Sequence, residues 1–202
     1  MDFRVFPLDK LIKLYGEDKV STLLKQFKSR NSDVENFIKS KAVQFEKVGL
    51  SRTSLVFGDY NQQSVVVGFF SLSSKPLTLS KENWKKISNS TKRKLLPLGY
   101  QSVRYNYCIP SILLGQISKN FSFADERLIG GDELLELAYR NVRQAAILIG
   151  GQVLYLEAED NKKINEFYTR NGFTCLRDSK MNVPIRQENS ELLLYVKKIK
   201  DI

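Results

Sequence analysis

The sequence has no histidine, only two cysteines and a single tryptophan among its 202 residues. Without an imidazole the chain cannot build the Ser-His-Asp or Cys-His catalytic machineries. The two cysteines, Cys108 and Cys175, lie far apart and lack the spacing of metal ligands, which excludes most zinc enzymes. Any catalysis must therefore use carboxylate, tyrosine, lysine, serine, cysteine, backbone dipoles or a bound cofactor.

Long apolar runs are also missing, and no stretch approaches the roughly 20 residues that a membrane span needs. The first fifteen residues contain Asp2 and Asp9 and lack a long apolar core, so no secretory signal is predicted. Apolar residues make up 42% and charged residues 27%, which is typical of a globular chain that folds without disulfides. We expect a cytoplasmic protein with reduced cysteines, no metal and no membrane partner.

The positive charge is concentrated in one segment. The formal net charge is +10, and residues 75–104 alone hold eight basic residues and one acidic residue. Such a block attracts polyanions, and Trp84 and Tyr100 within it offer rings on which a base can stack. The alternative is a solvated helix that keeps the protein soluble. The residues predicted to contact RNA are Lys85, Lys86, Lys92, Arg93 and Lys94.

Apolar periodicity and turn residues predict alternating helices and strands. The expected elements are helix 8–29 interrupted at Gly16, a helix beginning at a Ser32–Glu35 capping box, strands 53–57 and 64–72 joined by a turn at 58–61, a basic helix 80–96, strand 109–118, helix 132–149, strand 153–159, a short helix that ends at 171, and strands 173–176 and 191–199. The short helix is expected to be capped by Asp160 or Asn161 and to end in a left-handed turn at Gly172. The strand–helix–strand unit over 109–159 predicts two parallel strands joined by a right-handed crossover. The predicted fold is α/β with a mixed sheet.

Strand 153–159 and the helix after it carry the candidate chemistry. Glu157 and Glu159 share one face of the strand with Tyr155, and carboxylates on a central strand are costly unless paired or functional. They are candidate general bases, and structural pairing is the alternative for each. Tyr168 shares the apolar face of the following helix with Phe167 and should pack near the end of the strand. Taken alone, Tyr168 is better explained as a core aromatic residue whose hydroxyl is hydrogen-bonded.

The segment Leu156–Phe173, which ends in Phe-Tyr-Thr-Arg-Asn-Gly-Phe, resembles the GNAT family of acyl-CoA N-acyltransferases. Gly68–Ser73 and Leu113–Ser118 resemble the third and fourth strands of that family, and the N-terminal half resembles members from bacterial mobile elements and toxin modules. The resemblance implies a single GNAT-like domain over residues 1–202, with its core at about 30–199 and a basic insertion at 75–104. It also implies a mostly antiparallel mixed sheet with splayed central parallel strands, flanked by helices.

The resemblance also implies a site for acetyl-CoA and assigns residues to it. The backbone of Gln116, Ile117 and Ser118 would pair with the pantetheine arm, and Asn161 would bind the pantetheine amide with Phe167 beside it. Tyr168 would protonate the departing thiolate, since a phenol with a pKa of about 10 is acidic enough. No metal is implied.

The pyrophosphate loop implied by the resemblance is irregular here. The family pattern is Gln/Arg-x-x-Gly-x-Gly/Ala just before a helix. When it is aligned on Arg127, Gly130 matches a glycine of the pattern but Asp132 falls on the last small position. When it is aligned on the apolar pair at 134–135, Gly131 matches instead and the arginine falls outside the pattern. Both registers offer the N–H groups of Gly130, Gly131 and Asp132 at a helix N-terminus, which suits a phosphate. The acidic first turn is expected to favour the helix dipole and point away from phosphate. A plain loop is the alternative.

The predicted function is transfer of an acetyl group from acetyl-CoA to a primary amine, on an aminoacyl-tRNA or a protein. A non-catalytic nucleic-acid-binding module on a degenerate acyltransferase fold is the alternative, supported by the irregular loop. The partners considered are the amine acceptor, tRNA, a second copy of the chain as a homodimer, and an antitoxin.

Overall fold

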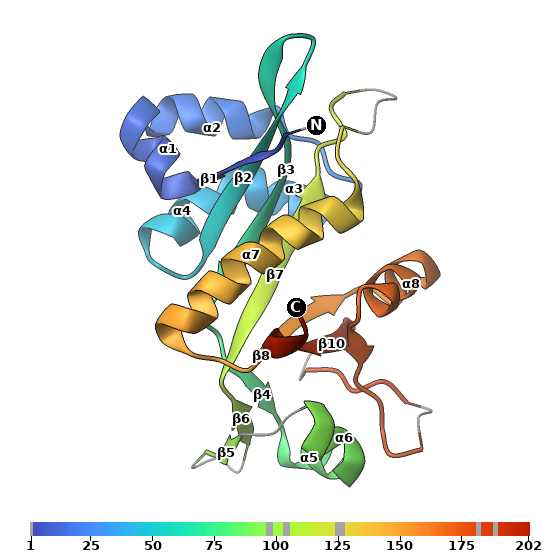
Figure 1. Cartoon of the computed structure of the whole chain (residues 1–202). Helices are drawn as coiled ribbons and strands as arrows, with labels where there is room; N and C mark the ends of the chain where they lie inside the picture. The colour runs from blue at the N-terminus through green and yellow to red at the C-terminus, as the bar shows by residue number, and fades with distance from the viewer. Residues whose placement is uncertain (1, 96–98, 103–105, 124–127, 181–182, 188–189) are drawn as a thin grey trace. The chain divides into compact units, whose positions relative to one another are not determined.

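The computed structural model describes residues 2–95, 99–102, 106–123, 128–180, 183–187 and 190–202. The chain divides into two compact units, here called unit 1 (Met1–Ser73 with Leu114–Arg140) and unit 2 (Ser74–Leu113 with Asn141–Ile202). Strand β7 (Ser111–Lys119) and helix α7 (Gly131–Ile149) contribute residues to both units. Figure 1 labels most helices and strands of both units. The expectation of a single domain stays a prediction.

Unit 1 is an antiparallel sheet with helices packed on it (Figure 1). Its elements, beside parts of β7 and α7, are β1 (Arg4–Pro7), α1 (Leu8–Tyr15), α2 (Glu17–Lys25), α3 (Ser32–Asn36), a π-helical turn (Phe37–Lys41), α4 (Ala42–Lys47), β2 (Arg52–Tyr60) and β3 (Gln63–Ser73). Gly16 breaks the first helix as expected, at a φ of 85° that favours glycine. The hairpin turn lies at Asn61 and Gln62, later than expected, because both residues adopt left-handed φ angles.

The core of unit 1 lies between its first helices and the β2–β3 hairpin. Leu24 and Phe27 of the α2 region and Ile38 of the π turn are buried in one cluster with Leu55 and Phe69 of the strands. The rings of Phe27 and Phe69 meet edge to face at 5.1 Å. Each such side chain contributes about 1.5–3 kcal/mol by leaving water, which fixes the helices on the sheet.

The helix that begins at Ser32 is capped by a different residue than expected. Asn31 Oδ1 accepts hydrogen bonds from the backbone N–H groups of Asp33 and Val34 at 2.9 and 3.1 Å. Glu35 reaches back past this cap to the N–H of Ser29 at 2.8 Å. The prediction that Ser32 is the cap was wrong by one residue, because asparagine caps a helix as well as serine does.

Unit 2 combines a small sheet, the basic helices and the C-terminal strands. Its elements, beside parts of β7 and α7, are β4 (Leu77–Leu79), α5 (Lys81–Lys86), α6 (Asn89–Leu95), β5 (Tyr100–Gln101), β6 (Tyr107–Ile109), β8 (Val153–Ala158), α8 (Lys162–Arg170), β9 (Thr174–Cys175), β10 (Leu193–Lys198) and a 3-10 turn (Ile199–Asp201). The expected basic helix is two short helices, because Ile87 leaves helical geometry to become buried and Ser88 Oγ then caps the second helix at Thr91 N–H, 3.1 Å away.

Hydrogen bonding orders the strands β1-β2-β3-β7-β8-β10-β9, with β4-β6-β5 as a separate sheet. The described β7–β8 register is parallel and covers three pairs, from Ser111↔Val153 to Leu113↔Tyr155, whereas the other described registers are antiparallel. This confirms the mixed, mostly antiparallel sheet with parallel central strands flanked by helices. The expected strand 109–118 is divided at Pro110, which lacks an N–H for the ladder. The splaying of β7 and β8 stays a prediction.

Candidate active site

Helix α8 has the cap and the exit that its sequence predicts. Asn161 Oδ1 accepts a hydrogen bond from the N–H of Lys163 at 2.9 Å. After the helix, Gly172 turns the chain at a φ of 81°, and the N–H of Phe173 closes the turn on the carbonyl of Tyr168 at 3.0 Å. A side chain at Gly172 would be strained at this φ, and its Cβ would lie 3.2 Å from Lys197 Nζ. Cap and exit together fix the length of the helix that carries Tyr168.

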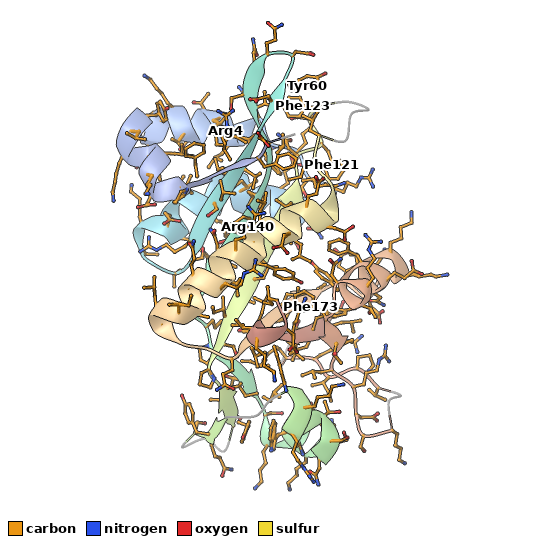
Figure 2. All side chains as sticks on the ribbon, in the orientation of Figure 1. Arg4, Tyr60, Phe121, Phe123, Arg140 and Phe173 are labelled. Carbon is orange, nitrogen blue, oxygen red and sulfur yellow. The ribbon has the colours of Figure 1, made fainter. Side chains whose placement is uncertain are left out.

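Tyr168 is partly buried among three aromatic rings. Its ring centroid lies 5.1 Å from that of Phe167, 5.5 Å from Phe173 and 5.3 Å from Tyr195. Phe173, labelled in Figure 2, comes from the turn after α8. Burial raises the pKa of Tyr168 to about 12, and none of the described residues hydrogen-bonds to its hydroxyl. The phenol is therefore protonated and its hydroxyl has no described partner, while burial makes it a weaker acid than an exposed tyrosine.

Phe167, predicted to contact the cofactor, lies beside Tyr168 on α8. Its other ring contact is with the guanidinium of Arg170, 5.3 Å from the ring centroid. The ring is partly exposed. Contact with the cofactor stays a prediction.

The acid and base candidates belong to opposite faces of the sheet in unit 2. Tyr168 packs on Tyr195, and Tyr195 pairs directly with Leu156 of β8, so these side chains share one face. Tyr155 and Glu157 alternate with Leu156 and point to the other face. Tyr155 there belongs to a buried apolar cluster with residues of β4 and β6. The expected alternation along β8 is confirmed.

Glu157 and Glu159 have different surroundings. Glu157 is partly buried and accepts a hydrogen bond from the Ser190 hydroxyl at 3.2 Å, whereas Glu159 is exposed. Burial, and then the charge of Glu157, raise the pKa of Tyr155 above its usual range. The hydroxyl of Tyr155 is buried without a hydrogen-bond partner. Glu157 is thus the more buried of the two carboxylates, and the role of either as base stays a prediction.

In unit 1, the predicted pantetheine-binding residues Gln116, Ile117 and Ser118 lie partly buried on β7. Gln116 Oε1 is a buried acceptor without a hydrogen-bond partner. The Ser118 hydroxyl bonds to that of Ser29 at 3.0 Å and donates to the Lys119 carbonyl at 2.8 Å. An unused buried acceptor of this kind suits the amide N–H of a pantetheine arm, because leaving it unpaired costs free energy.

The acidic first turn of α7 does not point away as expected. Glu133 folds back, and its carboxylate accepts the N–H of Gly130 at 2.8 Å. A carboxylate is favourable there because it pairs an otherwise unused donor and meets the positive end of the helix dipole. A phosphate that binds the same N–H must displace Glu133. The N–H groups of Gly131 and Asp132 begin the helix as predicted, and Arg127 lies outside the described residues.

Four of the five basic residues predicted to contact RNA are exposed on the helices α5 and α6. These are Lys85, Lys86, Arg93 and Lys94. Lys92 instead lies with its Nζ 5.0 Å over the ring of Trp84, and Trp84 stacks on Tyr107 at 3.5 Å. In this conformation the Trp84 ring already contacts Lys92 and Tyr107, whereas Tyr100 is 60% exposed. None of the five cations forms an ion pair with a described residue.

The described residues offer neither a metal centre nor a membrane span. No group of three or more histidine, cysteine, aspartate or glutamate residues in the described part of the chain could hold a metal ion. Among the described helices, none has the length and apolarity to cross a bilayer.

Tyr195 and Asn165 are the site residues that sequence reasoning missed. The Tyr195 hydroxyl hydrogen-bonds to Asn165 Oδ1, and Asn165 lies one turn before Tyr168 on α8. The sequence signal is weak. It consists of one tyrosine in the apolar run of β10 and one amide on a short helix, and only the folded structure brings them together.

No protein-family model matches the chain, and no curated protein matches it significantly. Solved structures do match it along its whole length. A tyrosine-to-phenylalanine variant of KacT has a TM-score of 0.64 and 20% identity, covering 100% of this chain and 97% of that one. AtaT complexed with acetyl-methionyl-tRNAfMet has a TM-score of 0.63 and 20% identity, covering 99% and 96%.

A third structure, a tyrosine-to-phenylalanine variant of AtaT bound to the C-terminus of the antitoxin AtaR and to acetyl-CoA, has a TM-score of 0.60. It is 17% identical and covers 100% of this chain and 96% of that one. KacT and AtaT are GNAT-fold toxin acetyltransferases. The chain therefore has the GNAT fold that its sequence resemblance implied.

Proposed function

We propose that this protein is an acetyl-CoA-dependent N-acetyltransferase whose acceptor is the amino group of an aminoacyl-tRNA. The observation that carries the proposal is the setting of Tyr168, a protonated phenol with a free hydroxyl on a helix fixed at both ends. The fold likeness to AtaT, solved with acetyl-CoA and with acetyl-methionyl-tRNAfMet, supports it.

The residues of each unit fit acetyl-CoA. In unit 1, Gln116 Oε1 lacks a donor, and the N–H groups of Gly130, Gly131 and Asp132 suit the pyrophosphate once Glu133 has moved. In unit 2, Asn161 and Phe167 bind the pantetheine arm and Tyr168 acts on the sulfur.

The reaction requires two proton movements. A neutral amine attacks the thioester carbonyl, and the oxyanion that forms is stabilised by a backbone N–H of β7 near Ile117 or Ser118. The carbon–sulfur bond then breaks, and Tyr168 donates its proton to the thiolate, so that free CoA leaves as a thiol. The amine loses its proton, through water, to Glu157 or Glu159. The amide product and the thiol account for every atom of the two substrates.

The choice of RNA as carrier of the amine rests on the cations of α5 and α6. Lys85, Lys86, Lys92, Arg93 and Lys94 form no ion pairs with described residues, so their charges are available to bind the phosphates of a polyanion. The complex of AtaT with acetyl-methionyl-tRNAfMet supports the same acceptor class. A protein acceptor remains the competing choice within this reaction.

A transfer assay tests the proposal. Radiolabelled acetyl-CoA is incubated with the protein and either a set of charged tRNAs or a panel of peptides, with uncharged tRNA as the control. Label that enters charged tRNA alone supports the proposal. Label in peptides alone would show that the acceptor is a protein and not a charged tRNA. Label in neither would refute the acetyltransferase activity.

A second candidate, a non-catalytic RNA-binding module, is favoured by one observation. The Glu133 carboxylate occupies the Gly130 N–H, where a pyrophosphate is expected, and it repels phosphate. Calorimetry with acetyl-CoA separates the candidates, because the module takes up no acetyl-CoA while its affinity for tRNA is retained.

An antitoxin is the further partner that we propose. AtaT is solved with the C-terminus of AtaR, and KacTA with DNA. In this chain Ile147, Leu148 and Ile149 at the end of α7 are 83, 83 and 62% exposed, a composition typical of a protein contact. A homodimer through the same residues is the other assembly considered, and light scattering of the purified chain distinguishes the two.

A further inference from the structure

A hydrogen bond between β10 and α8 lies directly beside Tyr168. The hydroxyl of Tyr195 donates to Asn165 Oδ1, and Asn165 Nδ2 in turn donates to Asp160 Oδ1 at 3.3 Å. Tyr195 is completely buried, and its ring lies 5.3 Å from that of Tyr168 with a tilt of 42°. The bond therefore joins the strand under Tyr168 to the helix that carries it.

The direction of this hydrogen bond follows from the donor and acceptor atoms. Asn165 has one acceptor oxygen and one donor nitrogen, and only the orientation with Oδ1 toward Tyr195 lets its nitrogen reach the Asp160 carboxylate. Tyr195 is then the donor. Burial raises its pKa to about 12, so it keeps this proton throughout the physiological range.

The same bond has a consequence for Tyr168. Two adjacent phenols can hydrogen-bond to each other, which would occupy the proton that Tyr168 needs for the thiolate. The Tyr195 hydroxyl donates to Asn165 and also interacts with the Cys175 thiol, and no described residue occupies the hydroxyl of Tyr168. Asn165 lies three residues before Tyr168, so the bond also fixes the rotation of this part of α8.

We propose that Tyr195 and Asn165 are positioning residues for Tyr168: their hydrogen bond sets the angle of α8 on β10 and keeps the Tyr168 hydroxyl free to protonate the thiolate. This inference rests on the proposed acetyl transfer. The two residues act through Tyr168 and touch neither substrate. Their removal should therefore lower the rate of the chemical step and leave acetyl-CoA binding intact.

A double-mutant cycle tests this coupling. Tyr195→Phe keeps the ring and removes only the hydroxyl, and we expect kcat to fall about tenfold through misplacement of the acid, with KM for acetyl-CoA unchanged. Asn165→Ala should give the same loss. In a Tyr168→Phe background, Tyr195→Phe should cause no further loss, because the group it positions is already absent.

Tyr155→Phe is the matched control. It removes another hydroxyl that is buried in the same sheet, but this hydroxyl has no partner and belongs to the opposite face. We expect full activity and an unchanged or raised unfolding temperature. A general loss of packing would affect both phenylalanine variants and would persist in the Tyr168→Phe background.

Two measurements keep this inference separate from the proposed function. If the wild-type protein transfers acetyl and Tyr195→Phe lowers kcat equally with and without Tyr168, the positioning role is refuted and the function stands. If the wild-type protein transfers no acetyl group, amide hydrogen exchange over residues 165–170 tests the positioning role instead. Faster exchange in Tyr195→Phe than in Tyr155→Phe supports the positioning role, and equal exchange overturns it.

Discussion

Replacing Lys85, Arg93 and Lys94 by alanine should weaken tRNA binding and flatten its dependence on salt. All three side chains are exposed on α5 and α6, and none is ion-paired with a described residue. Each phosphate that the variant no longer neutralises should lower the slope of log K against log salt by about 0.7–0.9. Three such phosphates then reduce the fall in affinity between about 50 and 200 mM salt by about 20- to 40-fold.

The assay is a filter-binding or anisotropy titration with uncharged tRNA at four salt concentrations. The matched control replaces three exposed lysines of unit 1, Lys10, Lys19 and Lys25, so that the net charge changes equally. If the slope of log K against log salt falls as much in the control variant as in the α5–α6 variant, the net charge of the protein explains the binding. An unchanged slope in the α5–α6 variant would refute the RNA surface.

Three further predictions concern the cofactor loop, the end of α8 and the buried phenols. Glu133→Ala frees the N–H of Gly130 and removes a charge near the phosphates, so acetyl-CoA should bind about fivefold more tightly by calorimetry, as expected for one hydrogen bond; weaker binding would contradict the loop assignment. Gly172→Ala should lower the free energy of unfolding in urea by about 1 kcal/mol or more, because φ is left-handed there; an unchanged value would refute this. Burial raises the pKa of Tyr168 and of Tyr195 to about 12, so tyrosines ionise first in the unfolded chain. The free energy of unfolding should therefore fall as pH rises from about 10 to 12, and constant stability over that range would contradict both shifts.

The features that the sequence predicted correctly are those that depend on residues adjacent in the chain. The cap at Asn161, the exit at Gly172 and the alternation along β8 each depend on a few adjacent residues and one rule of backbone geometry. The break at Gly16 is of the same kind. These local rules were enough to place Tyr168 on its helix.

The features that the sequence did not predict depend on distant contacts or on competition between nearby groups. Burial of Ile87 breaks the basic helix, and no local pattern shows that burial. The choice of Asn31 over Ser32 as cap depends on how the chain enters α3. Tyr195 and Asn165 lie 30 residues apart, so their bond appears only when β10 and α8 are packed.

Strand β1 was missed for another reason. Its four residues, Arg4–Pro7, are too few to show a period and end in proline. It forms because β2 offers a free edge, and the two strands pair from Arg4↔Phe57 to Pro7↔Ser54. Short edge strands depend on their partner for stability, so their own composition carries little signal.

The central claim is that Tyr168 supplies the proton that releases the thiolate, and Tyr168→Phe tests it most directly. Single-turnover acetyl transfer and calorimetry with acetyl-CoA are measured on the same preparation of wild-type and variant protein. We predict that transfer slows by about 100-fold or more, the contribution of a general acid, while acetyl-CoA affinity stays within about twofold. Transfer at the wild-type rate, with acetyl-CoA bound normally, would contradict the account.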